Sequence, residues 1–170
     1  MSVVLHEFLA RTPFFGGLPQ ESLARIAARL RQSDLEHGGT VFREGDQGRS
    51  MYVVEWGELM ALQNSASGRP VKLLRFAAGD FFGETTLIEM QPRPFSVVAE
   101  SDARLLELTA QDLYSLYRED VKAYVLVLQN INRELCRRLR RAGNRITEIA
   151  DDDDDCEITQ IRPEGIPRKK

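Results

Sequence analysis

The chain has 170 residues, 42% of them hydrophobic, which is enough for one domain with a core and a short appendage. Its 23 Lys and Arg residues nearly balance its 26 Asp and Glu residues, and the excess of acid lies in residues 151–170. The remaining body is neutral, which argues against a general nucleic-acid binder.

Two short helices are predicted near the N-terminus. Residues 3–10 form the first, and Pro19 marks the start of the second, since proline favours the first turn of a helix. Apolar residues in the second helix recur at the spacing of a buried stripe: Leu23, Ile26, Ala27 and Leu30. The aromatic pair Phe14 and Phe15 precedes this helix and is expected to pack on the β-structure.

Short apolar segments separated by glycine turns follow from residue 40 onward. Such regular short strands indicate a sandwich or barrel. The predicted strands are Thr40–Phe42, Met51–Trp56, Leu59–Leu62, Val71–Phe76, Phe95–Ala99 and Arg104–Leu108. We therefore predict an α+β chain built on an antiparallel β jelly-roll barrel (a double-stranded β-helix) of about eight strands.

The stretch from Gly79 to Ala99 has the composition of an anion-binding site. Gly83 allows the backbone to approach a ligand closely, and a short helix is predicted just after it, with free N–H groups that favour negative charge. Arg93 can bind a phosphate with two parallel hydrogen bonds. Glu84 is an acceptor, so it suits a sugar hydroxyl.

This stretch resembles the phosphate-binding cassette of cyclic-nucleotide-binding domains, which occur in catabolite activator-like regulators, protein kinase A regulatory subunits and cyclic-nucleotide-gated channels. The family pattern is roughly Phe-Gly-Glu-x-Ala-Leu, followed by Pro-Arg-x-Ala-Ser/Thr-Val. The matching residues here are Phe82, Gly83, Glu84, Leu87, Pro92, Arg93, Ser96 and Val97. Further likeness extends over about residues 13–140. We call residues 79–99 the cassette.

The resemblance implies that a cyclic mononucleotide, cAMP or cGMP, is the ligand. It implies that Glu84 binds the ribose 2′-hydroxyl and that Arg93 and Gly83 bind the cyclic phosphate. Arg138, on a later helix, is a candidate contact to the base. The full set of candidate binding residues is Phe82, Gly83, Glu84, Thr85, Arg93, Pro94, Phe95, Ser96 and Arg138.

Three features depart from the family pattern. Pro94 lacks the backbone N–H that donates to the phosphate in the family, which predicts an affinity lower by about ten- to a hundredfold. Phe95 replaces a small alanine. Ala142 and Gly143 fall where the catabolite activator holds adenine with hydroxyl groups. The alternative is therefore a degenerate fold in which Glu84 and Arg93 form an inherited ion pair.

A helix capped by Thr109 and then a long helix over residues 121–150 are predicted after the last strand. The long helix has a near-heptad apolar stripe: Tyr124, Leu128, Ile131, Leu135, Leu139, Ala142, Ile146 and Ile149. In the family this position is a helix that dimerises and covers the nucleotide, so we expect a homodimer. A single helix folded back on its own barrel is the alternative. Its six arginines are interpreted as a solvated face rather than a nucleic-acid surface.

The inventory of reactive groups argues against an enzyme. Cys136 and Cys156 form no CxxC pair, and two histidines are too few for a metal-dependent enzyme of this fold. We expect no cofactor, no metal, no export signal and no membrane span, and hence a cytoplasmic protein. Residues 1–150 are predicted to be one domain and residues 151–170 a disordered acidic tail.

Two functions are consistent with these observations. The first is a non-enzymatic regulatory module that binds a cyclic mononucleotide and signals through its long C-terminal helix to a protein partner that the sequence does not identify. The second is a dimeric interaction scaffold that binds no nucleotide.

Overall fold

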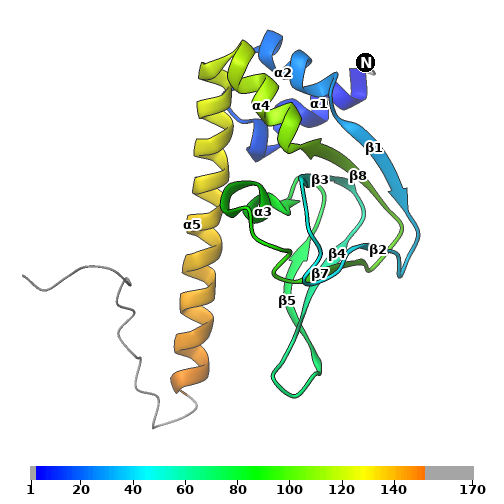
Figure 1. The fold of residues 1–170 in the computed structure, drawn as a ribbon, viewed down its shortest axis with the longest axis vertical. Helices are drawn as coiled ribbons and strands as arrows, with labels where there is room; N and C mark the ends of the chain where they lie inside the picture. Colours follow the sequence, from blue (N-terminus) through cyan, green and yellow to red (C-terminus); the bar gives the residue numbers. More distant parts are fainter. Residues whose placement is uncertain (1–2, 152–170) are drawn as a thin grey trace, which may run out of the picture. The chain divides into compact units, whose positions relative to one another are not determined.

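The computed structural model describes residues 3–151 (Figure 1). The helices are α1 (Val3–Arg11), the 3-10 helix η1 (Pro13–Phe15), α2 (Gln20–Ala27), α3 (Glu84–Glu89), α4 (Ala110–Glu119) and α5 (Val121–Asp151). The strands are β1 (Arg31–Leu35), β2 (Thr40–Phe42), β3 (Ser50–Trp56), β4 (Leu59–Asn64), β5 (Pro70–Phe76), β6 (Phe81–Phe82), β7 (Ser96–Ala99) and β8 (Ala103–Thr109).

The described residues divide into two compact units, one ending at Arg133 and one beginning at Glu134 within α5. The units are described separately below. The predicted domain of residues 1–150 is not tested by this division and stays a prediction. The predicted acidic tail lies outside the described residues apart from Asp151, the last residue of α5.

The strands form two antiparallel sheets of four strands each, in the orders β1-β8-β3-β6 and β2-β7-β4-β5. This arrangement is consistent with a jelly-roll sandwich. The predicted closed barrel is not present among residues 3–151, because no ladder of hydrogen bonds joins the edge strands of one sheet to those of the other. Side chains point alternately to the two faces of each strand, so one set from each sheet points inward. Two facing sheets can therefore enclose a core without closing into a barrel.

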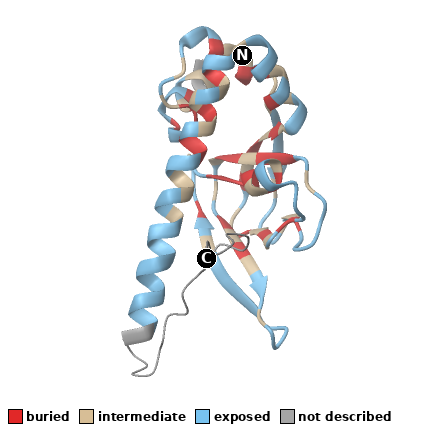
Figure 2. Cartoon of the chain, turned by 60° about the vertical axis from the view of Figure 1, so that its left-hand side comes forward, coloured by how far each residue is buried: buried red, intermediate tan, exposed pale blue. Residues whose placement is uncertain are grey.

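The core between the sheets is rich in aromatic side chains. Phe82 stacks on Tyr52 and on Phe76, with ring centroids 5.4 Å and 4.9 Å apart. Phe42 from the second sheet lies 5.9 Å from the same ring. Phe42, Phe76 and Phe82 are buried and Tyr52 is half-buried, and the cassette residues Phe82 and Val97 belong to this core. Figure 2 shows buried stretches along the strands.

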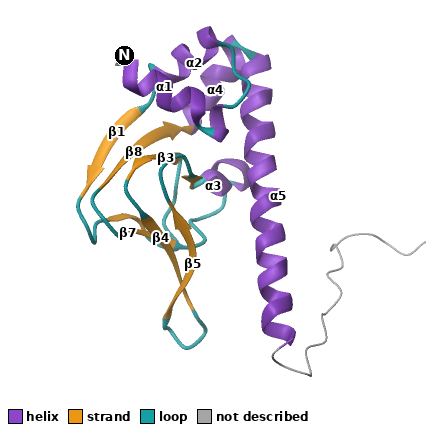
Figure 3. Ribbon diagram, turned by 180° about the vertical axis from the view of Figure 1, so that it is seen from behind, coloured by secondary structure: helices purple, strands orange, loops and turns teal. Residues whose placement is uncertain are grey.

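Helices α1, α2 and α4 gather at one end of the sandwich (Figures 1 and 3). Phe14 packs on Phe81 of β6 with centroids 5.0 Å apart, which confirms the expected contact of the aromatic pair with the β-structure. The buried Asn130 of α5 donates from Nδ2 to the carbonyl oxygens of Phe14 and Gly16, each over 2.9 Å. The first three turns of α5 are thereby tied to the N-terminal helices.

The predicted helix start at Thr109 is confirmed. Its hydroxyl accepts a hydrogen bond from the backbone N–H of Asp112, and the Asp112 carboxylate accepts one from the N–H of Thr109. Two such reciprocal bonds satisfy groups that a helix start leaves without partners. The six predicted strands are also present, and β1 and β6 are additional.

In the second unit, residues 134–149 of α5 expose apolar side chains along one stripe. Leu139, Ile146 and Ile149 are 74%, 56% and 64% exposed. Four arginines of this stretch pair with acidic residues of the same helix: Arg137, Arg138 and Arg141 lie near Glu134, and Arg145 lies near Glu148. No helix within residues 3–151 combines the length and the apolar character needed to cross a membrane.

Candidate functional site

The site is built around Gly83, which precedes the first turn of α3. Its φ of +84° lies in the left-handed region, which favours glycine. A Cβ at this position would lie 2.6 Å from Nη1 of Arg93 and 3.3 Å from the carbonyl oxygen of Ser50. The absence of a side chain therefore allows the guanidinium of Arg93 to lie against the backbone at the start of α3.

The backbone of Arg93 is fixed by the turn between β2 and β3. Its N–H donates to the carbonyl oxygen of Asp46 over 2.8 Å, and its carbonyl oxygen accepts from the N–H of Gly45 over 2.9 Å. Gly48 in the same connection leaves space for the side chain, since a Cβ there would lie 2.3 Å from Nε of Arg93. The arginine is thus positioned by two glycine-containing segments that are far apart in the sequence.

The guanidinium of Arg93 is 4% exposed and is surrounded by acceptors. Nη2 donates to the carbonyl oxygen of Ser50 over 2.7 Å, and Nη1 donates to the carbonyl oxygen of Gly83 over 3.0 Å and to Oγ1 of Thr86 over 3.3 Å. Its carbon Cζ lies 4.0 Å from the centre of the Phe42 ring, a cation–π contact.

Burial lowers the pKa of Arg93, while the nearby Tyr52, Glu84 and Asp46 raise it. An arginine keeps its proton at neutral pH even when its pKa falls. The site therefore holds a permanent positive charge beneath the start of α3.

Glu84 is the first residue of α3 and is 2% exposed. Its charge acts on Arg93, so the two side chains lie close enough to interact electrostatically. A buried carboxylate beside a guanidinium stays ionised more readily than one buried alone. The pair combines an acceptor for a hydroxyl with a donor for an anion, which is the arrangement that the sequence predicts for a sugar phosphate.

The other predicted residues of the cassette have different surroundings. Phe82 is fully buried in the core. Phe95 is half-buried against that core, 6.4 Å from the Phe42 ring. Pro94 is exposed and accepts a hydrogen bond from Nε2 of Gln63 at its carbonyl oxygen. Thr85 is a half-buried residue of α3.

Ser96 and Arg138 are described here within the unit to which each belongs. Oγ of Ser96 accepts the backbone N–H of Glu44 over 3.0 Å, so this hydroxyl stabilises the turn that holds Arg93. Arg138 belongs to the second unit, as do Ala142 and Gly143. Within that helix, Nε of Arg138 lies 3.4 Å from Oε1 of Glu134, one turn earlier.

Four groups around Arg93 were not predicted from the sequence: the Ser50 carbonyl, the Thr86 hydroxyl, the Phe42 ring and Gly48. Thr86 lies one helical turn after Gly83, so the helical spacing could have indicated it. A backbone carbonyl carries no residue-type signal, so Ser50 could not have been found this way. Among residues 3–151, no group of His, Cys, Asp and Glu could hold a metal ion.

Comparison with known proteins identifies the class. The family model for the cyclic nucleotide-binding domain matches residues 32–120, just over half of the chain. The chain belongs to this family, as its cassette indicates.

Relatives from two branches of the family are similar to this chain. A "CRP-like cAMP-activated global transcriptional regulator" of Mycobacterium tuberculosis is 27% identical over 145 residues, covering 85% of this chain and 63% of that protein. A "cAMP-dependent protein kinase regulatory subunit" of Aspergillus niger is 37% identical over 101 residues, covering 59% of this chain and 24% of the subunit. The chain thus spans less than two thirds of either relative.

Among solved structures, the catabolite activator protein of Thermus thermophilus is similar with a TM-score of 0.71 and 29% sequence identity. The similar region covers 81% of this chain and 63% of the activator. By their names, these relatives are regulatory proteins.

Proposed function

We propose that this chain is a non-enzymatic regulatory module that binds a cyclic mononucleotide, cAMP or cGMP, at the cassette. Arg93 and Gly83 bind the cyclic phosphate, and Glu84 binds the ribose 2′-hydroxyl. The observation that carries the proposal is the buried pair of Glu84 and Arg93 at the start of α3. Relatives whose names include cAMP favour this nucleotide over cGMP.

Binding at this site is an exchange of hydrogen-bond acceptors. The guanidinium of Arg93 donates to the carbonyl oxygens of Ser50 and Gly83. A phosphate is charged, so it is a stronger acceptor for the same donors than a neutral carbonyl. A ligand phosphate near Gly83 therefore draws the guanidinium toward the start of α3, and the net gain is the difference between the two sets of bonds.

Isothermal titration calorimetry with cAMP and cGMP tests the proposal. We expect Arg93→Lys to weaken binding at least about tenfold, because lysine keeps the charge but loses the planar pair of donors. Glu84→Gln should weaken binding similarly if the carboxylate binds the ribose. Arg75→Lys is the matched control, since this exposed arginine pairs with Glu58 and Glu100 on the outer side of β5. Equal affinities in all variants would contradict the proposed site.

A second candidate is an interaction scaffold that binds no nucleotide. It is favoured by Phe95, whose half-buried ring packs beside Phe42 where the family has a small residue, and by the missing N–H of Pro94. In that case the wild-type protein gives no heat with either nucleotide up to millimolar concentration, and Arg93 is a structural residue joining α3 to β3.

For the output of the module we propose homodimerisation and contact with a protein partner through α5. The exposed stripe of Leu139, Ile146 and Ile149 supports this, because apolar side chains repeated along one helix face favour a second helix. Four arginines of the same stretch are paired with Glu134 or Glu148, which supports a solvated face rather than a nucleic-acid surface.

A further inference from the structure

A groove in the first unit is lined by residues of α3, α4 and the first part of α5. Its volume is about 560 Å³, within the range of small-molecule sites. Ile131 and Leu113 form its floor and are 1% and 8% exposed, whereas Met90 at its mouth is 87% exposed. The groove is therefore a concave site rather than a flat apolar helix face.

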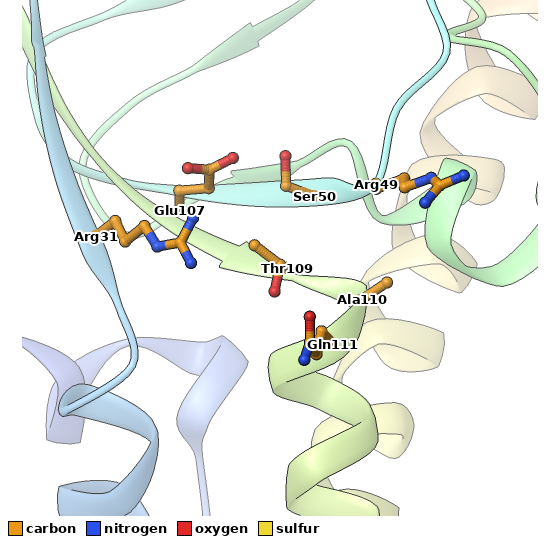
Figure 4. Close-up of a pocket in the computed structure, with 7 residues that line it drawn as sticks. All are labelled: Arg31, Arg49, Ser50, Glu107, Thr109, Ala110 and Gln111. Atoms are coloured by element: carbon orange, nitrogen blue, oxygen red, sulfur yellow. The ribbon is translucent and has the colours of Figure 1, made fainter.

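The lining of this groove differs from that of the hollow where β8 passes into α4 (Figure 4). That hollow is polar, and Arg49 points away from Arg31 and Glu107, so its charged side chains do not converge. The groove has no Asp, Glu, Lys, Arg or His among its lining residues, and its walls include Leu87 and Leu128. A charged group would lose water there without gaining an opposite charge, so the groove favours an uncharged ligand.

Three of the four tyrosines of the chain line the groove: Tyr114 and Tyr117 of α4, and Tyr124 of α5. Their rings form a row, with centroids 6.2 Å apart in the first pair and 5.4 Å apart between Tyr117 and Tyr124. Within residues 3–151, none of the three hydroxyl groups makes a hydrogen bond. The row therefore offers ring surfaces to an aromatic ligand and hydroxyl donors to an acceptor on that ligand.

Met90 adds an adaptable side chain at the mouth of the groove. It ends α3 with a φ of +56°, and among residues 3–151 it is the one residue other than glycine with a positive φ. Such a backbone conformation is uncommon for a residue with a side chain, and ligand sites are among the places where it occurs. The methionine side chain is flexible and packs well on aromatic rings, so Met90 suits a ligand ring at the mouth.

We propose that this groove binds a small, uncharged organic molecule with an aromatic ring system and a hydrogen-bond acceptor such as a carbonyl group. The aliphatic floor and walls contact the rings of the ligand, and the tyrosine row packs against them. A tyrosine hydroxyl donates to the acceptor. Binding at the groove does not depend on a nucleotide at the cassette.

The groove and the cassette share α3. Glu84 is the first residue of this helix, and Leu87, three residues later, lines the groove. Between them, Thr86 accepts a hydrogen bond from Nη1 of Arg93 over 3.3 Å. A ligand that shifts α3 therefore changes the affinity of the cassette for its nucleotide, and the nucleotide changes the affinity of the groove by the same factor. This coupling, unlike the groove site itself, rests on the proposed function.

Two uncharged fluorescent probes test the site: N-phenyl-naphthylamine, which has no carbonyl group, and prodan, a naphthalene that carries one. We expect each probe to bind saturably, with one molecule per chain. Ile88→Glu places a carboxylate in the wall of the groove and should weaken both probes about tenfold. Val71→Glu is the matched control, because Val71 of β5 lies outside the lining and is 46% exposed, close to the 48% of Ile88. Circular dichroism checks that both variants are folded.

Isosteric variants test the role of the hydroxyl groups. Tyr114→Phe, Tyr117→Phe and Tyr124→Phe in combination keep the three rings and remove the three donors. The combined variant should weaken prodan about two- to tenfold, the effect of one lost hydrogen bond, and leave N-phenyl-naphthylamine unchanged. A purely structural role of the tyrosines would change both probes alike.

Three outcomes would overturn the proposal. The first is that neither probe binds saturably, and the second is that Ile88→Glu and Val71→Glu change the affinities equally. The third is probe binding that strengthens when the protein is diluted, which would assign the groove to a second copy of the chain. An equal effect of the combined tyrosine variant on both probes would overturn the hydrogen-bond acceptor in the proposed ligand.

The coupling is measured as the change in the cAMP dissociation constant at saturating N-phenyl-naphthylamine, compared between wild type and Ile88→Glu. We expect a change in wild type and a smaller one in the variant. An unchanged dissociation constant in wild type overturns the coupling alone. A failure of cAMP to bind overturns the proposed function and leaves the probe measurements at the groove intact.

Discussion

Nη2 of Arg93 donates to the backbone carbonyl oxygen of Ser50 over 2.7 Å. The arginine of the cassette is therefore satisfied by the main chain of β3, with the Phe42 ring stacked against it. An anion that binds Arg93 must therefore compete with these internal acceptors. Because of this competition, we expect substitutions in the cassette to change the affinity for the nucleotide.

Pro94→Ala should strengthen nucleotide binding. The substitution introduces a backbone N–H next to Arg93, and a hydrogen bond to a charged acceptor contributes about 1.5–3 kcal/mol, or roughly ten- to a hundredfold in affinity. The carbonyl oxygen of residue 94 keeps its bond to Gln63. Calorimetry with cAMP on wild type and Pro94→Ala measures the gain. The companion variant Pro92→Ala, two residues earlier, should not show it, and an unchanged affinity in Pro94→Ala would exclude a role for this N–H.

Asn130→Ala should destabilise the first unit by about 1–3 kcal/mol, because two carbonyl oxygens near η1 lose their donor. Asn130 is 7% exposed, so water replaces the lost bonds poorly. Urea denaturation followed by circular dichroism gives the free energy of unfolding. Asn144→Ala, at an exposed position on the same helix, is the control. Alanine has a higher helix propensity than asparagine, so Asn144→Ala should not destabilise the protein, and a free energy of unfolding that is unchanged or raised in Asn130→Ala would contradict the role of the two hydrogen bonds.

Acid should weaken the junction between α4 and α5. Hydrogen bonds from the Ser22 hydroxyl and the Ala123 N–H lower the pKa of Asp120. A carboxyl group with a lowered folded-state pKa contributes stability above its unfolded pKa, near 3.8, and loses it as pH falls through the folded value. The melting temperature of wild type should therefore fall more steeply than that of Asp120→Asn below about pH 4. Parallel curves for the two proteins would contradict this assignment.

Leu139→Glu and Ile146→Glu should each reduce self-association. Both side chains are more than half exposed, and a charge on an apolar helix stripe opposes helix pairing. Sedimentation velocity over a range of protein concentrations measures the dimer fraction. Arg140→Glu alters the adjacent residue outside the stripe and serves as the control. If wild type stays monomeric at high micromolar concentration, the proposed dimer through α5 is wrong.

Much of the fold follows from local patterns in the sequence. The segments Met51–Trp56 and Arg104–Leu108 are short and mostly apolar, and both are strands in the structure. β1 has the sequence Arg-Gln-Ser-Asp-Leu and is almost entirely exposed. No alternating pattern of hydrophobic residues therefore predicts this strand. It becomes a strand by pairing with β8, a long-range contact that local reasoning does not see. The sequence predicts a closed barrel incorrectly because it indicates how many strands there are, but not whether the edge strands of the two sheets pair with each other.

The candidate site was predictable only in part. Gly83, Glu84 and Arg93 carry residue-type signals for a sugar phosphate, and the structure brings them together. The contact with Ser50 is made by a backbone carbonyl, so any residue at position 50 could supply it. Pro94 and Phe95 were noted as departures, and the structure shows Phe95 against the core. The role of Arg138 stays a prediction, since the two units are described separately.

The stacking of Arg93 on Phe42 has a wider consequence. Phe42 belongs to the sheet β2-β7-β4-β5, whereas Ser50 belongs to β1-β8-β3-β6, so one cation spans both layers of the sandwich. Moving the Arg93 guanidinium away from these two contacts therefore weakens a connection between the two sheets, and not only the packing of one loop. When the guanidinium moves, the exchange of amide protons with solvent should change together in β2 and in β3, because Arg93 contacts both strands.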